Sequence, residues 1–238
     1  MMLSAVGLSK SFGGLRVVDD VSVEVEAGTC LGIMGPNGAG KSTFFDLLTG
    51  TTRADAGKVA VDGQDVTGAA VADRVKAGLA RAFQIPRPFE SLTVFETLRL
   101  AQHSVLGLWG PAADRTADDI LARVGLDTQA KTPGGALRLL DRKRLELAKA
   151  LACRPKVLLL DEVSGGLTSE EVDQMIEIVA ELKSRGLAIL WVEHIAHALQ
   201  KVSDRVMMLH MGAKLIEDTP EAVSSDPDVQ ELYLGTQK

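Results

Sequence analysis

The stretch GPNGAGKST, residues 35–43, decides the fold of this chain. It fits the pattern G-x-x-x-x-G-K-[ST], a loop whose backbone N–H groups surround phosphate oxygens. Residues 29–34 before it are apolar, as in a buried strand, and residues 43–48 after it have the pattern of a helix that ends at Gly50. Glycines permit the tight curl of the loop, and the N-terminus of the following helix favours a bound anion. The sequence therefore predicts a phosphate-binding loop between a strand and a helix.

Two side chains of this loop have specific predicted roles. Lys41 reaches the β- and γ-phosphates of a nucleotide, and the Ser42 hydroxyl holds Mg²⁺. The alternative is a glycine-rich turn that precedes a lysine by chance, and the flanking strand and helix argue against it. The loop residues assigned to nucleotide binding are Gly35, Pro36, Asn37, Gly38, Ala39, Gly40, Lys41, Ser42 and Thr43.

The composition predicts a globular protein of a reducing, cytosolic compartment. Its 238 residues suit one domain, and 46% hydrophobic with 24% charged residues is ordinary for that class. The net charge of −6 indicates no preference for polyanions, so we expect no nucleic-acid partner. Cys30 and Cys153 lie far apart in apolar runs, which is typical of reduced core residues. We find neither a signal-peptide pattern nor an apolar run long enough to span a bilayer.

The first part of the chain predicts antiparallel strands. Val21, Val23 and Val25 alternate with polar residues, as in a half-exposed strand. Residues 58–63 repeat the pattern and end at an Asp-Gly turn. Near the other end, residues 206–216 contain a second hairpin pattern around a Met-Gly pair.

Later strands predict a parallel α/β core. Residues 157–160 and 188–192 are wholly apolar, as in parallel strands covered on both faces, and residues 170–183 between them have helical periodicity. The fold class is therefore α/β: a P-loop NTPase with a RecA-like parallel core and an antiparallel β subdomain. Residues 86–152, in which residues 137–151 look helical, form a helical insertion. We expect a single domain, with 1–85 and 153–238 as the core and 86–152 as the helical subdomain.

An acidic pair follows the buried strand at residues 157–160. An apolar strand that ends in an acid, downstream of a phosphate loop, brings Asp161 to the coordination sphere of Mg²⁺. Glu162 points elsewhere and can polarise the attacking water as a general base. Acids also end strands without any chemical role, but the Lys41 loop upstream favours the functional interpretation.

Two polar residues at other strand ends extend the predicted site. His194 follows the strand at residues 188–192, at the ligand-binding edge of a parallel sheet, where it can contact the γ-phosphate. Gln84 stands at the entrance to the helical insertion, where its amide can touch Mg²⁺ or water. Taken alone, His194 is better explained as an ordinary polar residue that caps a strand, and Gln84 alone is uninformative.

Together, these motifs resemble the ATP-binding subunits of ABC transporters over essentially the whole chain. The order is the loop at residues 35–43, then Gln84, Asp161-Glu162 and Glu193-His194. The resemblance implies ATP and Mg²⁺ as cofactors and hydrolysis coupled to transport, catalysed by Lys41, Glu162 and His194. It implies permease partners and a peripheral location at the cytoplasmic face of the inner membrane. Phe12 matches the aromatic position that stacks on adenine, with an ordinary core phenylalanine as the alternative.

Two stretches are similar to the branched-chain amino acid importer branch of that family. These are residues 83–94 and the ending Leu232-Tyr233-Leu234-Gly235. In that branch, two different ATPase subunits serve two permease subunits and a periplasmic binding protein. The resemblance implies import of amino acids, amides or urea-like solutes. Residues 85–92 mix prolines with apolar side chains and are expected either to hold a permease helix or simply to pack the insertion.

The chain departs from the family at its signature, usually Leu-Ser-Gly-Gly-Gln. Counting back from residues 143–148 puts Leu137-Arg138-Leu139-Leu140-Asp141 at that place, without the serine and glycines. Thr168 stands where the family usually has Asp. Because one subunit's signature closes over the other's ATP, we hypothesise two unequal ATP sites and a second, non-identical ATPase partner.

Two other functions stay open at this stage. A soluble ABC ATPase can act on nucleic acid, the ribosome or lipopolysaccharide machinery, although such proteins often carry two fused cassettes and this chain has one. A small-molecule P-loop kinase has no use for Gln84, Glu193-His194 and the helical insertion together. The transported solute cannot be read from this sequence, because permease and binding protein select it.

Overall fold

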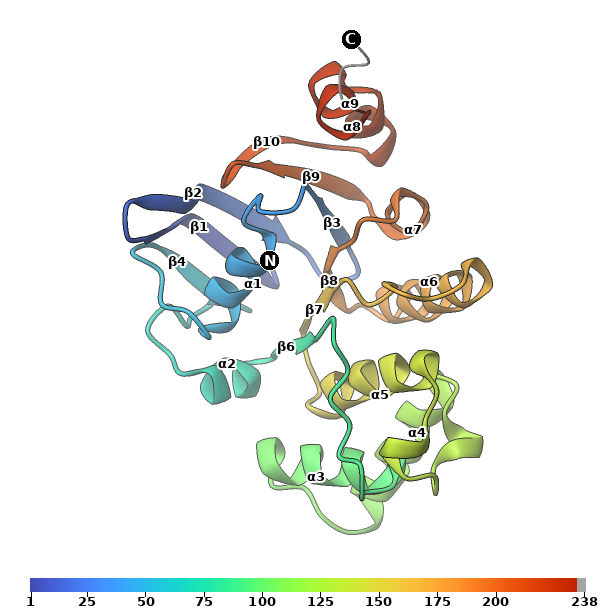
Figure 1. Cartoon of the computed structure of the whole chain (residues 1–238). Coiled ribbons are helices and arrows are strands. Elements are labelled where there is room, and N and C mark those ends of the chain that lie inside the picture. The colour runs from blue at the N-terminus through green and yellow to red at the C-terminus, as the bar shows by residue number, and fades with distance from the viewer. Residues whose placement is uncertain (235–238) are drawn as a thin grey trace.

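The computed structural model describes residues 1–234 and contains an antiparallel sheet with the order β2-β1-β4-β5 (Figure 1). In β2, Val21, Val23 and Val25 are buried while Glu24 between them is exposed. The alternating pattern therefore belongs to a sheet with one buried and one solvent-exposed face. The expected Asp-Gly turn joins β4 to β5. The strands are β1 (Leu3–Phe12), β2 (Leu15–Val25), β4 (Ala56–Val61) and β5 (Gln64–Asp65).

The second sheet has the order β10-β9-β3-β8-β7-β6 and is parallel except for its edge strand β10. Every residue of β7 and β8 is buried, which explains why both strands are wholly apolar until the final acid of β7. The expected Met-Gly hairpin joins β9 to β10. The strands are β3 (Cys30–Met34), β6 (Leu79–Ala82), β7 (Val157–Asp161), β8 (Ala188–Val192), β9 (Arg205–His210) and β10 (Ala213–Asp218).

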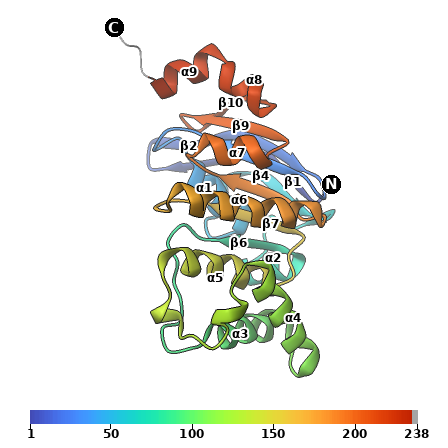
Figure 2. The ribbon, with the colours of Figure 1, turned by 90° about the vertical axis from the view of Figure 1, so that its right-hand side faces the viewer.

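Two apolar cores lie on the two faces of the parallel sheet. One fills the space between the two sheets around α1 (Lys41–Thr49), whose Phe44 and Phe45 are fully buried. The other lies under α6 (Ser169–Ser184) and α7 (Ala196–Val202), which cover the opposite face (Figure 2). The remaining core helices are α2 (Val71–Ala77), α8 (Pro220–Ser225) and α9 (Pro227–Leu234).

The described elements between residues 86 and 152 are helical and gather beyond the β6 edge of the parallel sheet (Figures 1 and 2). They are α3 (Val94–Leu106), α4 (Pro111–Arg123) and α5 (Leu139–Ala152), with short 3-10 turns between α4 and α5. The prediction of a helical insertion is thus confirmed. The helix expected from residue 137 begins two residues later, because Leu137 and Arg138 are extended.

Three smaller expectations have different outcomes. Cys30 is buried, but Cys153 is only part-buried at the C-cap of α5, so the second cysteine is not a core residue. Within residues 1–234, the helices are too short or too polar to cross a bilayer. Of the C-terminal ending, residues 232–234 lie in α9 and Gly235 lies outside the described residues.

Candidate functional site

The phosphate loop connects β3 to α1, as the sequence predicts. Two of its glycines permit close packing against neighbouring backbone. A Cβ at Gly35 (φ 154°) would lie 2.3 Å from the carbonyl oxygen of Leu209, and one at Gly40 (φ 101°) would lie 2.4 Å from that of Val17. Gly40 also caps α1, so the unpaired N–H groups of the first helical turn belong to the loop.

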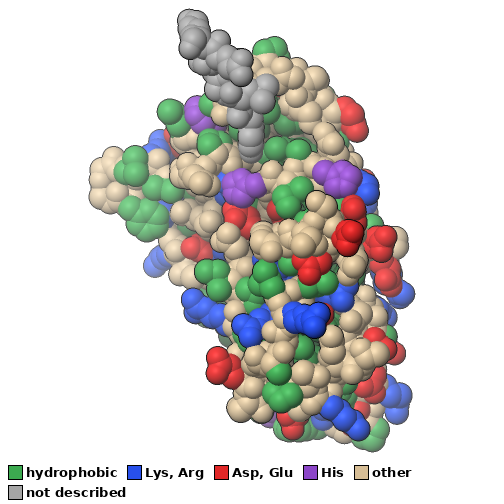
Figure 3. All heavy atoms as spheres, turned by 45° about the vertical axis from the view of Figure 1, so that its right-hand side comes forward, with side chains coloured by type: hydrophobic (Ala, Val, Ile, Leu, Met, Phe, Trp, Pro, Cys, Tyr) green, Lys and Arg blue, Asp and Glu red, His purple; other side chains and the backbone are tan. Residues whose placement is uncertain are grey.

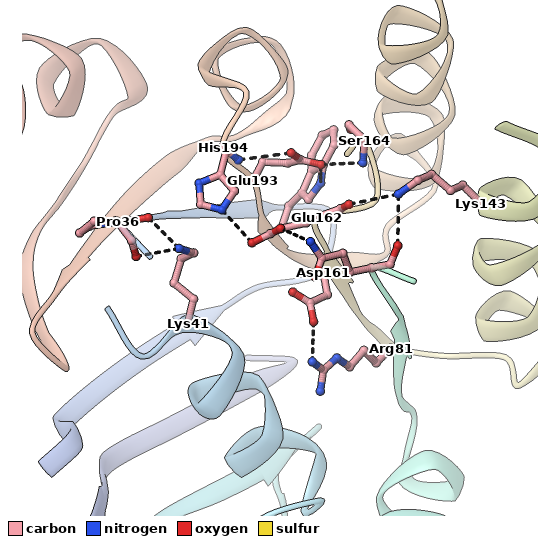
Figure 4. A network of polar contacts seen from close by, with 12 residues as sticks. Pro36, Lys41, Arg81, Lys143, Asp161, Glu162, Ser164, Glu193 and His194 are labelled. Atoms are coloured by element: carbon pink, nitrogen blue, oxygen red, sulfur yellow. Dashed lines mark hydrogen bonds and ion pairs between the residues drawn. The ribbon is translucent and has the colours of Figure 1, made fainter. Parts of the chain in front are cut away.

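Lys41 is buried, and its ammonium lies against the loop itself. The Nζ atom donates to the carbonyl oxygens of Gly35 at 2.7 Å and Pro36 at 3.1 Å (Figure 4). Burial lowers the pKa of Lys41, while Glu162 and Asp161 act in the opposite direction. The loop therefore presents a cation to the acidic end of β7.

Asp161 ends β7 and is buried beside Arg81 of β6. Arg81 Nη2 donates to Asp161 Oδ2 at 2.5 Å, and Nη1 donates to Asp46 Oδ1 of α1 at 2.6 Å. Ser42, Gln84 and Asp161 line one groove. Their hydroxyl, amide and carboxylate oxygens are the hard donors that Mg²⁺ prefers, so this donor set fits the predicted metal.

Glu162 follows Asp161 and has an unusual backbone. Its φ of +46° lies in the left-handed region, which is costly for a residue with a Cβ. Its N–H donates to the carbonyl of Val192 at 2.9 Å, which ties the turn to the end of β8. This turn directs the Glu162 carboxylate away from that of Asp161 (Figure 4).

The Glu162 carboxylate joins the two other predicted polar residues. His194 Nε2 lies 2.8 Å from Glu162 Oε1 (Figure 4). The Gln84 amide donates to Glu162 Oε2. The sequence analysis assigned His194 to the γ-phosphate and Gln84 to Mg²⁺ or water. In the structure both contact Glu162, so those two roles stay predictions.

Glu193 has a structural role that the sequence analysis did not identify. Its buried carboxylate accepts from the backbone N–H of Ser164 at 2.9 Å and from Trp191 Nε1 at 3.2 Å. Its other oxygen accepts from the N–H of His194 at 3.3 Å. Glu193 therefore fixes the loop after Glu162 to the strand end that carries His194.

Two basic residues near the acidic pair were also missed. Arg81 had a detectable pattern, because a charge within an otherwise apolar strand needs a buried partner. Lys143 had none: it is one of several charged residues of its helix, and only the structure shows that it and Glu146 are the buried ones, at 3% and 4% exposure. Its Nζ donates to the carbonyl oxygens of Gln84 at 3.2 Å and Glu162 at 3.4 Å.

Phe12 lies at the end of β1 and is 51% exposed. The alternative of a core phenylalanine is therefore wrong. Lys10 Nζ lies 5.4 Å from the centre of its ring, and an exposed ring is free to stack on a planar ligand. Adenine stacking at Phe12 stays a prediction.

The altered signature forms the start of α5. Arg138 is the exposed N-cap residue, and Leu139 after it is 46% exposed. A Cβ at Gly166 would lie 3.4 Å from Leu139 Cδ2, so this leucine lies beside the loop that follows Glu162. Thr168 caps α6 through a reciprocal pair of hydrogen bonds with Glu171, a role that needs a hydroxyl or a carboxylate.

A groove of about 680 Å³ extends from the acidic pair toward the helical insertion. Phe83 and Ile85 line it and are exposed, and Phe89 nearby is also exposed. The groove also receives residues from α2, α3 and α5. A groove is therefore present at the junction of Gln84 and the insertion, but Phe89 and Leu92, on which the sequence analysis relied, are not among its lining residues. Whether residues 85–92 hold a permease helix stays a prediction.

Comparisons with known proteins agree with one another, and the relatives match nearly the full length of the chain. The family model "ABC transporter" matches residues 18–165. The branched-chain amino acid transport ATP-binding protein BraF of Pseudomonas aeruginosa is 34% identical, covering 98% of both chains. The lipopolysaccharide export ATP-binding protein LptB of Haemophilus influenzae is also 34% identical, covering 99% of this chain and 98% of its own.

A solved structure supports the same assignment. The ATP-binding cassette MJ1267 of an ABC transporter, in its ADP conformation, superimposes with a TM-score of 0.90 at 29% identity, covering 98% of each chain. The family match, the relatives and the loop geometry all lead to one conclusion: the chain belongs to the ABC transporter family, as an ATP-binding subunit.

Proposed function

We propose that this chain hydrolyses ATP to drive an importer of branched-chain amino acids or related small polar solutes. One observation carries the proposal: the Glu162 carboxylate, held by Gln84 and His194, stands at the strand end beside Asp161 and faces the Lys41 loop. A base, a metal-ligand carboxylate and a phosphate-binding cation then share one sheet edge. That set is what phosphoryl transfer to water needs.

Each residue has a distinct proposed role. Lys41 and the N–H groups of the loop bind the β- and γ-phosphates. Ser42, Gln84 and Asp161 hold Mg²⁺, which when bound neutralises charge on the phosphate oxygens. Glu162 orients and polarises the attacking water, and the His194 hydrogen bond keeps that carboxylate in place before the γ-phosphate arrives.

The solute class rests on the relatives. Similarity to BraF supports branched-chain amino acids, and amides or urea-like solutes follow only from the sequence resemblance. Similarity to LptB supports a second candidate, a lipopolysaccharide-type export machinery. Uptake of labelled leucine in a host strain that lacks this chain separates the two. Loss of uptake with a normal cell envelope supports the importer, and normal uptake with an altered envelope supports the export machinery.

The proposed partners follow from two surfaces. The apolar groove beside Gln84 and Phe83 suits a permease helix at the cytoplasmic face of the inner membrane. A periplasmic binding protein lies on the other side of the membrane, so it acts on this chain only through the permease. The altered start of α5 favours a second, non-identical ATPase subunit. We propose residues 86–152 as the helical subdomain, which makes these contacts together with residues 83–85 of the core. The face in Figure 3 carries both acidic and basic side chains, the basic ones in a row across its middle, and the net charge of −6 favours these partners over nucleic acid.

ATP turnover by the purified chain, assembled with its partner ATPase subunit, tests the proposal. Glu162→Gln is expected to lower phosphate release at least about 100-fold while ATP still binds. Glu170→Gln is the control, because Glu170 is exposed on the first turn of α6, outside the proposed site. Wild-type turnover by Glu162→Gln, or transfer of phosphate to an acceptor other than water, would overturn the proposal.

A further inference from the structure

Lys143 is a buried cation for which neither the family comparisons nor the proposed mechanism has a role. It lies in the second turn of α5, a helix of the insertion, and reaches across to the core (Figure 4). The described contacts of its Nζ are both with backbone carbonyl oxygens, those of Gln84 at 3.2 Å and Glu162 at 3.4 Å. Lys143 therefore links the insertion to two residues whose side chains also bond to each other.

Burying the charge of a lysine at this position costs free energy. Burial lowers the pKa of Lys143, and the charges of Glu193 and Glu162 offset only part of that effect. A methionine of similar length would fill the same space without burying a charge. What the ammonium adds is N–H donors aimed at two carbonyls.

Both carbonyls belong to backbone segments that need support. Glu162 has a φ of +46°, and a strained conformation of this kind persists only where surrounding contacts determine it. Its carbonyl accepts from the N–H of Gly165 at 3.1 Å as well as from Lys143. Gln84 leads from the short strand β6 into an irregular stretch, where no sheet hydrogen bonds hold it.

We propose that Lys143 is a positioning residue that couples the insertion to the catalytic carboxylate. By holding the Gln84 and Glu162 backbones together, it keeps the Glu162 carboxylate between the Gln84 amide and His194. Movement of α5 would shift both carbonyls at once. This inference rests on the proposed ATP hydrolysis.

The test compares Lys143→Met with Lys143→Arg in the full chain, assembled with its partner ATPase subunit. The methionine variant is expected to bind ATP as well as wild type, with KM within about threefold, but to lose about 100-fold in kcat because the base is misplaced. Arginine, which keeps the donors, is expected to restore kcat to within about tenfold. Lys183→Met is the matched control: Lys183 also donates to a carbonyl, that of Val202, but lies on α6 away from the site.

The outcomes of these measurements separate the positioning role of Lys143 from the proposed function. A Lys143→Met variant with wild-type kcat overturns the positioning role, as does an equal loss of kcat in the arginine variant. If the methionine variant does not bind ATP, Lys143→Gln is judged by the same criteria. If the wild-type chain does not hydrolyse ATP even when it is assembled with its partner ATPase, the proposed function is refuted instead, and the two failures are therefore distinguishable.

Discussion

Arg81 Nη2 lies 2.5 Å from Asp161 Oδ2, and the two side chains are each only 8% exposed. The pair joins the neighbouring strands β6 and β7, and the second ion pair of Arg81, with Asp46, extends it to α1. The guanidinium also lies over the rings of Phe45 and Phe83. The carboxylate proposed to hold the metal is thus fixed in direction by a buried cation.

Removal of this cation is expected to be strongly destabilising. Arg81→Met leaves the buried Asp161 carboxylate without its partner, which costs about 3–5 kcal/mol of unfolding free energy. Asp46→Asn, which affects the more exposed partner, is expected to cost far less. Urea unfolding measures both. Equal losses for the two variants would contradict the importance of the Arg81–Asp161 contact.

Substitution of Arg74 is expected to lower the free energy of unfolding without impairing function. It is buried and donates to four carbonyl oxygens, those of Leu47, Leu48, Thr67 and Ala69, at 2.7–3.2 Å. Two of these carbonyls lie at the end of α1, which begins at the phosphate loop. Arg74→Met is expected to lower the unfolding free energy by about 2–4 kcal/mol, since the carbonyls lose their donors.

ATP binding separates this structural role from a functional one. Because Arg74 lies at the far end of α1 from Lys41, the Arg74→Met variant is expected to keep the ATP affinity of the wild type below its melting temperature. Isothermal titration of the folded variant measures this. A tenfold loss of affinity with unchanged stability would show that our assignment is wrong.

The buried thiol of Cys30 is expected to make the free energy of unfolding depend on pH. Burial raises the pKa of its thiol to about 12 against an ordinary value of about 8.5, with a hydrogen bond to Ser203 acting in the other direction. Above pH 8.5 the unfolded chain loses this proton while the folded chain keeps it. The stability contributed by the neutral thiol is therefore full below about pH 8.5 and is lost as the pH rises toward about 12.

Denaturant unfolding between pH 8 and 10.5 measures this effect. The unfolding free energy of the wild type is expected to fall more steeply with pH than that of Cys30→Ala, by up to one proton, or about 1.4 kcal/mol per pH unit. Cys153→Ala is the comparison: burial also raises the pKa of the part-buried Cys153 thiol, so this variant is expected to change the slope in the same direction but by less than Cys30→Ala. Identical slopes for wild type and Cys30→Ala would refute the assignment.

The altered signature predicts two unequal ATP sites in a heterodimer. Glu162→Gln with Mg-ATP is expected to stay monomeric alone, because Leu139 and Leu140 prevent the close backbone approach that glycines allow. With a defined partner ATPase, the combined change Arg138→Ser, Leu139→Gly and Leu140→Gly is expected to accelerate turnover at the partner's ATP. Solution mass and single-site turnover are the measurements. An ATP-dependent homodimer, or no change in rate, would count against the hypothesis.

Several elements of the fold were predictable because their patterns are local. The phosphate loop with α1, the alternating β2, the apolar β7 and β8 and the hairpin turns all depend on residues close together in the chain. The position of the site is predictable from the same patterns, because the carboxyl ends of parallel strands meet at one edge of the sheet. That is why the amino-acid pattern alone groups Asp161, Glu162 and His194 at one edge.

Contacts between distant segments were not predictable in the same way. Arg81 with Asp161, Lys143 with the Gln84 and Glu162 carbonyls, and Glu193 with the Ser164 N–H each join segments that only the sheet order and the docking of α5 bring together. A helical period shows which face of α5 is apolar, but it does not show which single lysine on that helix is buried.

The sequence by itself determined that this chain binds nucleotide phosphates, because the loop motif encodes its own backbone geometry within nine residues. Only the tertiary structure decided what holds the acidic pair in place. Gln84 and His194 lie 78 and 32 residues from Glu162 in the chain, and their hydrogen bonds exist because β6, β7 and β8 are adjacent in the sheet. The physical reason is that hydrogen bonds act over about 3 Å in space, whatever the separation along the chain.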